Sequence, residues 1–173
     1  MGEKLDHSWL RQGSTDGKEV KSIYDTWAAT YDDTVKDWGY QAPGEAAKLL
    51  RADVPEVAHI LDVGCGTGLT GEALRHAGFV GPIDGIDLSP ESLKEAKKKG
   101  HYTQLTEVDL QQLPLPINDN AYDALLCAGV LTYITNDAAL FREFARVVRS
   151  SGTLVITQRT DLFHERKYDA LLA

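Results

Sequence analysis

The sequence predicts an α/β fold with a mostly parallel sheet and a ligand site at one edge of that sheet. A short apolar run, residues 60–63, passes directly into the glycine-rich residues 64–68 and then into a segment suited to a helix. Two later apolar runs, residues 83–88 and 102–108, each have an aspartate at or just beyond their end. Parallel strands joined by helices bring their carboxyl ends to one edge, where such sheets bind ligands. We therefore expect these glycines and acids to share a site.

The first part of the chain is expected to form an arm and a helical cap. Residues 1–17 are polar with little apolar material, which is typical of a flexible arm. From residue 18 to residue 38, apolar and aromatic side chains recur at helical spacing, which predicts an amphipathic helix over the ligand edge. A second helix over residues 45–52 completes this N-terminal helical cap, residues 18–52.

Residues 18–173 are interpreted as one domain, with a ligand-binding core over residues 53–157. Residues 111–120 contain two prolines and are expected to form a loop in place of a full crossover helix. Residues 150–152 are expected to turn the chain into the last strand. The expected strands are residues 60–63, 83–88, 102–108, 122–128 and 153–157, and the expected helices between them are residues 70–77, 90–99 and 137–148.

Two of these helices have clear end signals. Ser89 is a suitable N-cap, Pro90 fits the first helical position, and Glu91 favours the positive end of the helix dipole. Gly100 supplies the stop. Asn136 is a suitable cap for the helix that begins at residue 137.

The glycines at positions 64, 66 and 68 need a physical reason. Glycine has no Cβ, so it adopts positive φ angles and lets a ligand lie against bare backbone. Because the turn opens a helix, its free N–H groups also face whatever lies above the strand end. The turn suits a flat ligand with an anionic part. The alternative is a tight strand-to-helix turn without a ligand.

The motifs resemble those of the class I S-adenosylmethionine-dependent methyltransferases. Residues 61–68, LDVGCGTG, resemble the first motif of that family, and Asp87 stands at its ribose-binding acid. Residues 109–110 fall where family members contact the adenine, and residues 122–127, YDALLC, resemble the strand beside the methionine end. The resemblance covers residues 21–157 and implies a Rossmann-like three-layer sandwich. More narrowly, the chain resembles the Williams-Beuren-region methyltransferase-like proteins.

The resemblance implies S-adenosylmethionine as cofactor and S-adenosylhomocysteine as product. It also places residues 129–135 where relatives keep substrate-facing residues. No general base is assigned, since the histidines offer no clear candidate. The cofactor-binding residues that we expect are Trp27, Tyr31, Asp62, Gly64, Cys65, Gly66, Gly68, Asp87, Leu88, Asp109, Leu110 and Cys127.

Trp27 and Tyr31 enter this set through the segment YDTWAATYD, residues 24–32. It is similar to an N-terminal pattern of many small-molecule methyltransferases, in which the second tyrosine approaches the methionine part of the cofactor. Trp27 and Tyr31 are one helical turn apart, so two rings share one face and could exclude water from a ligand. The alternative is an aromatic core stripe.

Composition limits the partners. The formal net charge of −8 argues against a nucleic-acid substrate, because neutralising phosphates requires a basic face. No apolar run reaches the roughly 18 residues that a membrane span needs, and residues 1–17 lack the apolar centre of a signal peptide. We expect a cytosolic or nuclear protein. The two cysteines, Cys65 and Cys127, predict neither a disulfide framework nor a metal site.

Residues 158–173 depart from the resembled family. They are charged and end in a segment that predicts a helix, whereas the family continues with a helix and an antiparallel strand pair, which has no counterpart here. We therefore expect either a shortened form or a last third that differs from the resembled family. The last strand, residues 153–157, would then be an exposed edge that favours self-association and lower stability.

Three functions are compatible with these motifs. The preferred one is methyl transfer from S-adenosylmethionine to a small-molecule or protein acceptor. A second is an S-adenosylmethionine-binding regulatory module without catalysis. A third is an NAD-dependent oxidoreductase, although its fingerprint asks for glycine or alanine three positions after Gly66, where Leu69 stands, and gives Asp109 no role.

Overall fold

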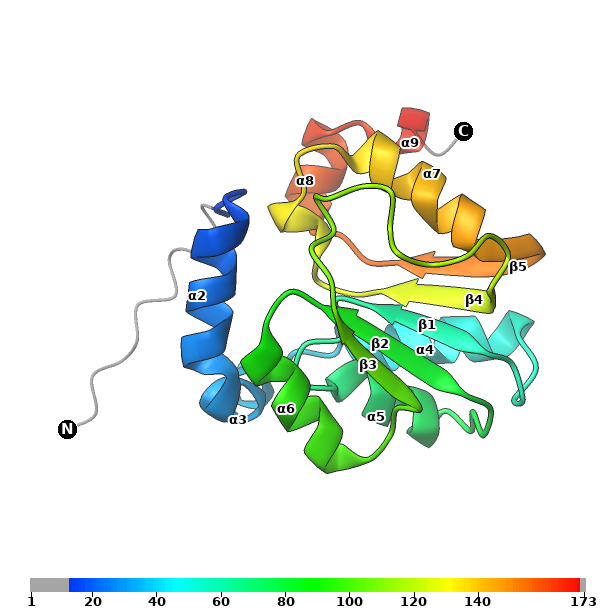
Figure 1. Cartoon of the computed structure of the whole chain (residues 1–173), viewed down its shortest axis with the longest axis horizontal. Helices are drawn as coiled ribbons and strands as arrows, with labels where there is room; N and C mark the ends of the chain where they lie inside the picture. Colours follow the sequence, from blue (N-terminus) through cyan, green and yellow to red (C-terminus); the bar gives the residue numbers. More distant parts are fainter. Residues whose placement is uncertain (1–12, 172–173) are drawn as a thin grey trace.

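The computed structural model describes residues 13–171 (Figure 1). The predicted arm, residues 1–17, therefore lies mostly outside the described residues. Five strands form one sheet in the order β3-β2-β1-β4-β5, and every neighbouring pair is parallel. The predicted α/β class is confirmed. The strands are β1 (Ile60–Val63), β2 (Ile83–Asp87), β3 (Gln104–Glu107), β4 (Tyr122–Cys127) and β5 (Val148–Ile156).

Helices cover both faces of the sheet. The α-helices are α2 (Gly17–Trp27), α3 (Tyr31–Asp37), α4 (Ala42–Asp53), α5 (Leu69–His76), α6 (Pro90–Lys99), α7 (Asp137–Val147), α8 (Thr160–Glu165) and α9 (Tyr168–Leu171), with 3₁₀ turns η1 (Ala28–Thr30) and η2 (Leu131–Tyr133). Alternate side chains of β1 enter different cores. Ile60 packs with residues of α4 and α5 on one face, and Leu61 packs with residues of α7 and α9 on the other. The three-layer sandwich follows from this alternation.

The predicted helix ends are confirmed. The Ser89 side chain accepts a hydrogen bond from the Ser92 N–H, and α6 stops at Gly100, which has a φ of 72°. The Asn136 side chain accepts a hydrogen bond from the Ala139 N–H at the start of α7. Each cap satisfies an N–H that the first helical turn leaves without a backbone partner.

The structure differs from the sequence prediction at two places. The single helix expected over residues 18–38 is interrupted by η1, where the Thr30 hydroxyl donates to the Trp27 carbonyl and competes with regular helical bonding. The expected turn at residues 150–152 is a bulge inside β5, since β4 pairs with Val148 and again with Thr153. Ser151 has a φ of 65° in this bulge. Side-chain bonding and bulges both depend on neighbours that the spacing of apolar residues does not report.

The last described segment is helical, as predicted. Tyr168 of α9 is buried and its ring lies 5.6 Å from that of Phe141 on α7. Strand β5 is the outermost strand on its side of the sheet. Within residues 13–171 no helix has both the length and the apolar character that crossing a membrane requires. The cellular location stays a prediction.

Candidate cofactor-binding site

A cavity lies at the carboxyl ends of β1, β2 and β4, beneath α2. It lies where the order of the sheet reverses, between β1 and β4, the usual ligand position in open α/β sheets. It is lined by Gly17, Val20, Lys21, Tyr24, Tyr31, Gly64, Gly66, Thr67, Asp87, Leu88, Ser89, Ser92, Asp109, Leu110, Gln111, Ala128, Gly129, Val130, Tyr133 and Ile134.

The glycine turn gives the cavity a wall of bare backbone. Gly64 and Gly66 have φ angles of 69° and 52°. A Cβ built on Gly64 would lie 2.1 Å from the Val130 side chain, so glycine is required there for packing. A Cβ built on Gly66 meets no atom within 4 Å, because this position faces open space. A side chain at Gly66 would extend into that space, so glycine keeps it free.

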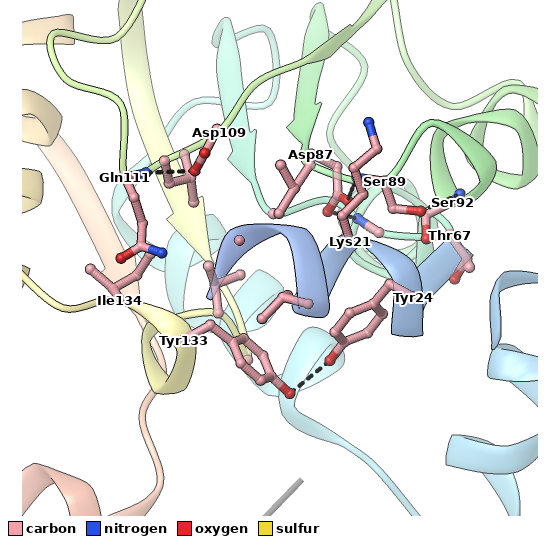
Figure 2. A pocket seen from close by; sticks show the side chains of 18 of the residues that line it. Lys21, Tyr24, Thr67, Asp87, Ser89, Ser92, Asp109, Gln111, Tyr133 and Ile134 are labelled. Carbon is pink, nitrogen blue, oxygen red and sulfur yellow. Dashed lines mark hydrogen bonds between the residues drawn. The ribbon is translucent and has the colours of Figure 1, made fainter. Parts of the chain in front are cut away.

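Asp87 ends β2 inside this cavity. Its carboxylate accepts hydrogen bonds from the Gly66 and Ser89 N–H groups, both at 2.8 Å (Figure 2). Burial raises the pKa of Asp87, whereas these backbone N–H donors lower it. A carboxylate has about four acceptor positions, so Asp87 retains the capacity to accept from a ligand hydroxyl.

Asp109 lies at another side of the cavity. Its carboxylate accepts a hydrogen bond of 2.9 Å from the Gln111 N–H and one of 3.2 Å from the Gln112 side chain. The Gln111 side chain in turn donates to the Thr15 carbonyl at 2.7 Å, which joins this loop to the residues just before α2. The loop that contains Gln111 thus holds the Asp109 carboxylate and also contacts the residues just before α2.

Three tyrosines line the cavity under the cap. The hydroxyls of Tyr24 on α2 and Tyr133 on η2 are 2.8 Å apart and form a hydrogen bond across the opening (Figure 2). Tyr31 packs beside Tyr24, with 6.1 Å between ring centroids. Burial is the main cause that raises the pKa of Tyr24, Tyr31 and Tyr133. Their hydroxyls are therefore protonated donors at neutral pH.

Polar bonds attach α2 to the rim of the cavity. Lys21 forms an ion pair with Glu107 at the end of β3. The Ser89 hydroxyl, at the start of α6, donates to the Asp25 carboxylate at 2.6 Å. Figure 1 accordingly shows α2 beside α6, across the end of the sheet toward which β4 and β5 point.

Seven of the twelve predicted cofactor-binding residues line the cavity: Tyr31, Gly64, Gly66, Asp87, Leu88, Asp109 and Leu110. The other five, Trp27, Asp62, Cys65, Gly68 and Cys127, are buried outside its lining. Trp27 packs against Tyr31, with 4.7 Å between ring centroids. Both cysteines are free thiols whose pKa burial raises. Contact of these twelve residues with the cofactor stays a prediction.

The sequence did not assign cofactor contacts to Lys21, Tyr24, Thr67, Ser89 or Gln111, which also line the cavity. One signal was available for Tyr24. Within residues 24–32 a tyrosine followed by an aspartate occurs twice, seven residues apart, which places both tyrosines on one helical face. The expected substrate-facing segment, residues 129–135, contributes four lining residues.

Comparison with known proteins decides the family. Residues 61–156 match the family described as "Methyltransferase domain". The chain belongs to this methyltransferase family. The methyltransferase chain is 35% identical over 164 residues to methyltransferase-like protein 27 of Homo sapiens, an alignment that covers 93% of the chain and 66% of the relative.

Two solved structures are similar in fold to this methyltransferase chain. A chain from a complex between the Haloferax volcanii Trm112 methyltransferase activator and a methyltransferase has a TM-score of 0.65 at 25% identity, covering 77% of this chain and 58% of that one. An S-adenosylmethionine-dependent methyltransferase from Mesorhizobium loti has a TM-score of 0.53 at 29% identity, covering 62% and 50%. The chain thus spans between half and two thirds of the length of these relatives.

The cofactor of this family is S-adenosylmethionine, and the cavity fits it. The open wall at Gly66 accommodates a ligand against backbone, and the Asp87 carboxylate beside it suits paired hydroxyls.

Proposed function

We propose that the chain is an S-adenosylmethionine-dependent methyltransferase acting on a small-molecule or protein acceptor. The observation that carries the proposal is the junction of the Asp87 carboxylate with the bare backbone of Gly66 on one cavity wall, 2.8 Å apart. In this arrangement Asp87 binds the ribose hydroxyls, and the backbone of Gly64 and Gly66 faces the methionine part. Asp109 accepts from the adenine amino group. When bound, the cofactor supplies a methyl group on a positively charged sulfur.

The residues around the cavity favour an acceptor that needs no base from the protein. The three lining tyrosines are protonated donors, and the lining of the described chain contains no histidine. Asp87 and Asp109 are both engaged by backbone N–H groups. The protein therefore orients the acceptor and excludes water, while the acceptor brings an atom that is already nucleophilic, such as an unprotonated nitrogen or a thiolate.

Cofactor binding tests the proposal first. Isothermal titration calorimetry should show binding of S-adenosylhomocysteine but not of NAD. Asp87→Asn should weaken that binding at least about tenfold, because a charge-assisted hydrogen bond contributes about 1.5–3 kcal/mol. Asp84→Asn is the matched control, since Asp84 lies on the same strand β2 and bonds His59 and Tyr122 instead of lining the cavity. Binding of NAD instead would support the oxidoreductase alternative.

Catalysis needs a separate test. Transfer of labelled methyl from S-adenosylmethionine to amines, thiols and protein extracts would support the enzyme. If the chain binds S-adenosylhomocysteine tightly and transfers no methyl to any of them, the regulatory module without catalysis becomes the better account.

Self-association through β5 is part of the proposal. Strand β5 is an outermost strand, and Leu154 on it has 39% of its surface exposed. An unpaired strand edge is a template for a second chain. Light scattering after size-exclusion chromatography should show a concentration-dependent dimer that Leu154→Lys weakens. A monomer at every concentration would count against this interface.

A further inference from the structure

The ring of Tyr102, just before β3, lies against three glycines. A Cβ built on Gly71 would lie 2.4 Å from the ring, at Cζ. The corresponding distances to the ring are 3.3 Å from Gly68 and 3.0 Å from Gly85. The chain therefore leaves a groove behind the glycine turn, and one aromatic ring fills it.

Two of these glycines occupy positions where glycine lowers the stability of the fold. Gly71 is in the first turn of helix α5, and Gly85 is in the middle of the buried strand β2. Glycine inside a helix costs about 1 kcal/mol relative to alanine, and it also weakens strands. At Gly71 the three nearest atoms all belong to Tyr102. Room for the Tyr102 ring explains why alanine does not stand at Gly71.

The hydroxyl of Tyr102 connects two elements of the turn. It donates a hydrogen bond of 2.7 Å to Asp62 on β1 and accepts one of 2.9 Å from the Gly71 N–H on α5. Asp62 is fully buried, and its other carboxylate oxygen has no hydrogen-bond partner among the described residues. Tyr102 is thus the hydrogen-bond donor that holds this acid.

The hydrogen bond between the Gly71 N–H and the Tyr102 hydroxyl acts as the N-cap of helix α5. Helix α5 begins after Gly68, which has no side chain with which to cap it. A polar N-cap side chain would normally accept from the second or third N–H of the helix, and Gly71 is the third residue of α5. Tyr102 supplies that acceptor from the side of the turn away from the cavity.

We infer that Tyr102 is a positioning residue of the cofactor site, because its hydroxyl fixes the strand before the glycine turn and the helix after it. No side chain on the cavity side of the turn is then needed to hold the turn in place. This inference rests on the proposed function, since it concerns binding of the same cofactor.

A matched control lies in the same sheet, at the amino ends of β4 and β2. The Tyr122 hydroxyl donates to Asp84 at 3.0 Å, and Asp84 likewise has one buried oxygen without a hydrogen-bond partner among the described residues. Neither residue lines the cavity. Tyr122→Phe therefore removes a tyrosine–aspartate hydrogen bond, as Tyr102→Phe does, but it leaves Asp84 bonded to His59 and does not touch the turn.

The decisive experiment compares these two variants in the full chain. Urea unfolding should show that both lose stability. Calorimetry should show that Tyr102→Phe binds S-adenosylhomocysteine about fivefold to tenfold more weakly, whereas Tyr122→Phe stays within about twofold of the wild type. Equal affinities in the two variants would overturn the inference. A wild-type chain that binds no S-adenosylhomocysteine would contradict the proposed function instead.

A pH profile separates positioning from a general loss of structure. The groups that face Asp62 are Tyr102, Asp87, Cys65 and Cys127. Burial raises the pKa of Asp62 to about 7, and the hydrogen bond from the Tyr102 hydroxyl opposes part of this rise. The affinity for S-adenosylhomocysteine should change across neutral pH, and Tyr102→Phe should move the midpoint to higher pH. Tyr122→Phe should leave the midpoint in place. A midpoint that both variants move equally, or neither moves, would contradict the inference.

Gly71 offers an independent variant pair should either phenylalanine variant fold poorly. Gly71→Ala places a methyl against the ring of Tyr102 and should destabilise the wild-type chain. In a Tyr102→Ala background the same substitution should cost much less stability, because the groove is then empty. Equal costs in both backgrounds would show that the groove is not shaped for Tyr102.

Discussion

The Asp32 carboxylate on α3 accepts a hydrogen bond of 2.5 Å from the hydroxyl of Thr67, a buried residue of the glycine turn. Lys99, at the end of α6, forms an ion pair with the same carboxylate. The second half of the helical cap is thereby attached directly to the cofactor-binding turn. Because Thr67 also lines the cavity, this contact links the position of α3 to the wall of the cavity.

Thr67→Val should loosen this attachment. Valine keeps the shape of threonine but leaves Asp32 paired with Lys99 alone, so closure of the cap loses about 1 kcal/mol. We expect S-adenosylhomocysteine to bind about fivefold more weakly, mainly through faster dissociation, measured by stopped-flow fluorescence of the chain. Thr106→Val, on β3 and outside the lining, is the control and should leave dissociation unchanged. A wild-type rate in Thr67→Val would show that the bond between Thr67 and Asp32 does not limit opening of the cap.

Gly64 and Gly66 should respond differently to alanine. Both have positive φ angles, so each substitution strains the backbone by about 1–2 kcal/mol. Gly64→Ala adds a clash with Val130 and should mainly lower the melting temperature. Gly66→Ala adds a methyl that faces open space, and it should fold with a modest loss of stability while binding of S-adenosylhomocysteine falls steeply. Differential scanning calorimetry and titration calorimetry on the same samples check both parts.

The opposite pattern would be informative. If Gly66→Ala bound the cofactor as well as wild type, the bare backbone at that position would not be part of the site. The glycine would then serve the turn alone, which is the alternative that the sequence left open.

The sequence predicts those residues of the site that lie at the end of a single strand. Gly64, Gly66 and Asp87 follow short apolar runs, and a parallel sheet brings such ends together whatever the details of packing. The caps at Ser89 and Asn136 were likewise predictable, because capping involves residues only three positions apart.

The parts that were not predicted depend on contacts between distant residues. Tyr24 and Tyr133 are 109 positions apart, and Tyr102 is 40 positions from Asp62. Nothing local to Tyr102 indicates that its hydroxyl caps a helix, since its position predicted only the start of a strand. Five of the expected cofactor contacts, Asp62 among them, lie outside the cavity lining because the family motif identifies residues without telling which way each one faces.

Ser89 should matter more for stability than Asp25, although the two are hydrogen bonded. Ser89→Ala removes both the cap of α6 and the bond to Asp25, and the loss of an N-cap costs about 0.5–2 kcal/mol. Asp25→Ala removes the bond from the Ser89 hydroxyl and a longer one, 3.4 Å, from the Glu91 N–H, and it leaves the N-cap of α6 in place. Urea unfolding should place Asp25→Ala between wild type and Ser89→Ala. If Asp25→Ala were the less stable of the two, attachment of α2 would contribute more than capping.

Asp62 gives the fold a stability that depends on pH. Burial raises its pKa from an ordinary 3.8 to about 7, so the folded chain binds this proton more tightly than the unfolded chain does. Its contribution is therefore most favourable below about pH 4 and is lost as pH rises toward 7, with a slope of up to about 1.4 kcal/mol per pH unit. Asp62→Asn cannot titrate and should lack this slope. Urea unfolding from pH 5 to pH 8 should show the free energy of unfolding of the wild type falling relative to that of the variant. The difference should become constant above pH 7. A difference that grows in favour of the wild type would mean that ionised Asp62 stabilises the fold.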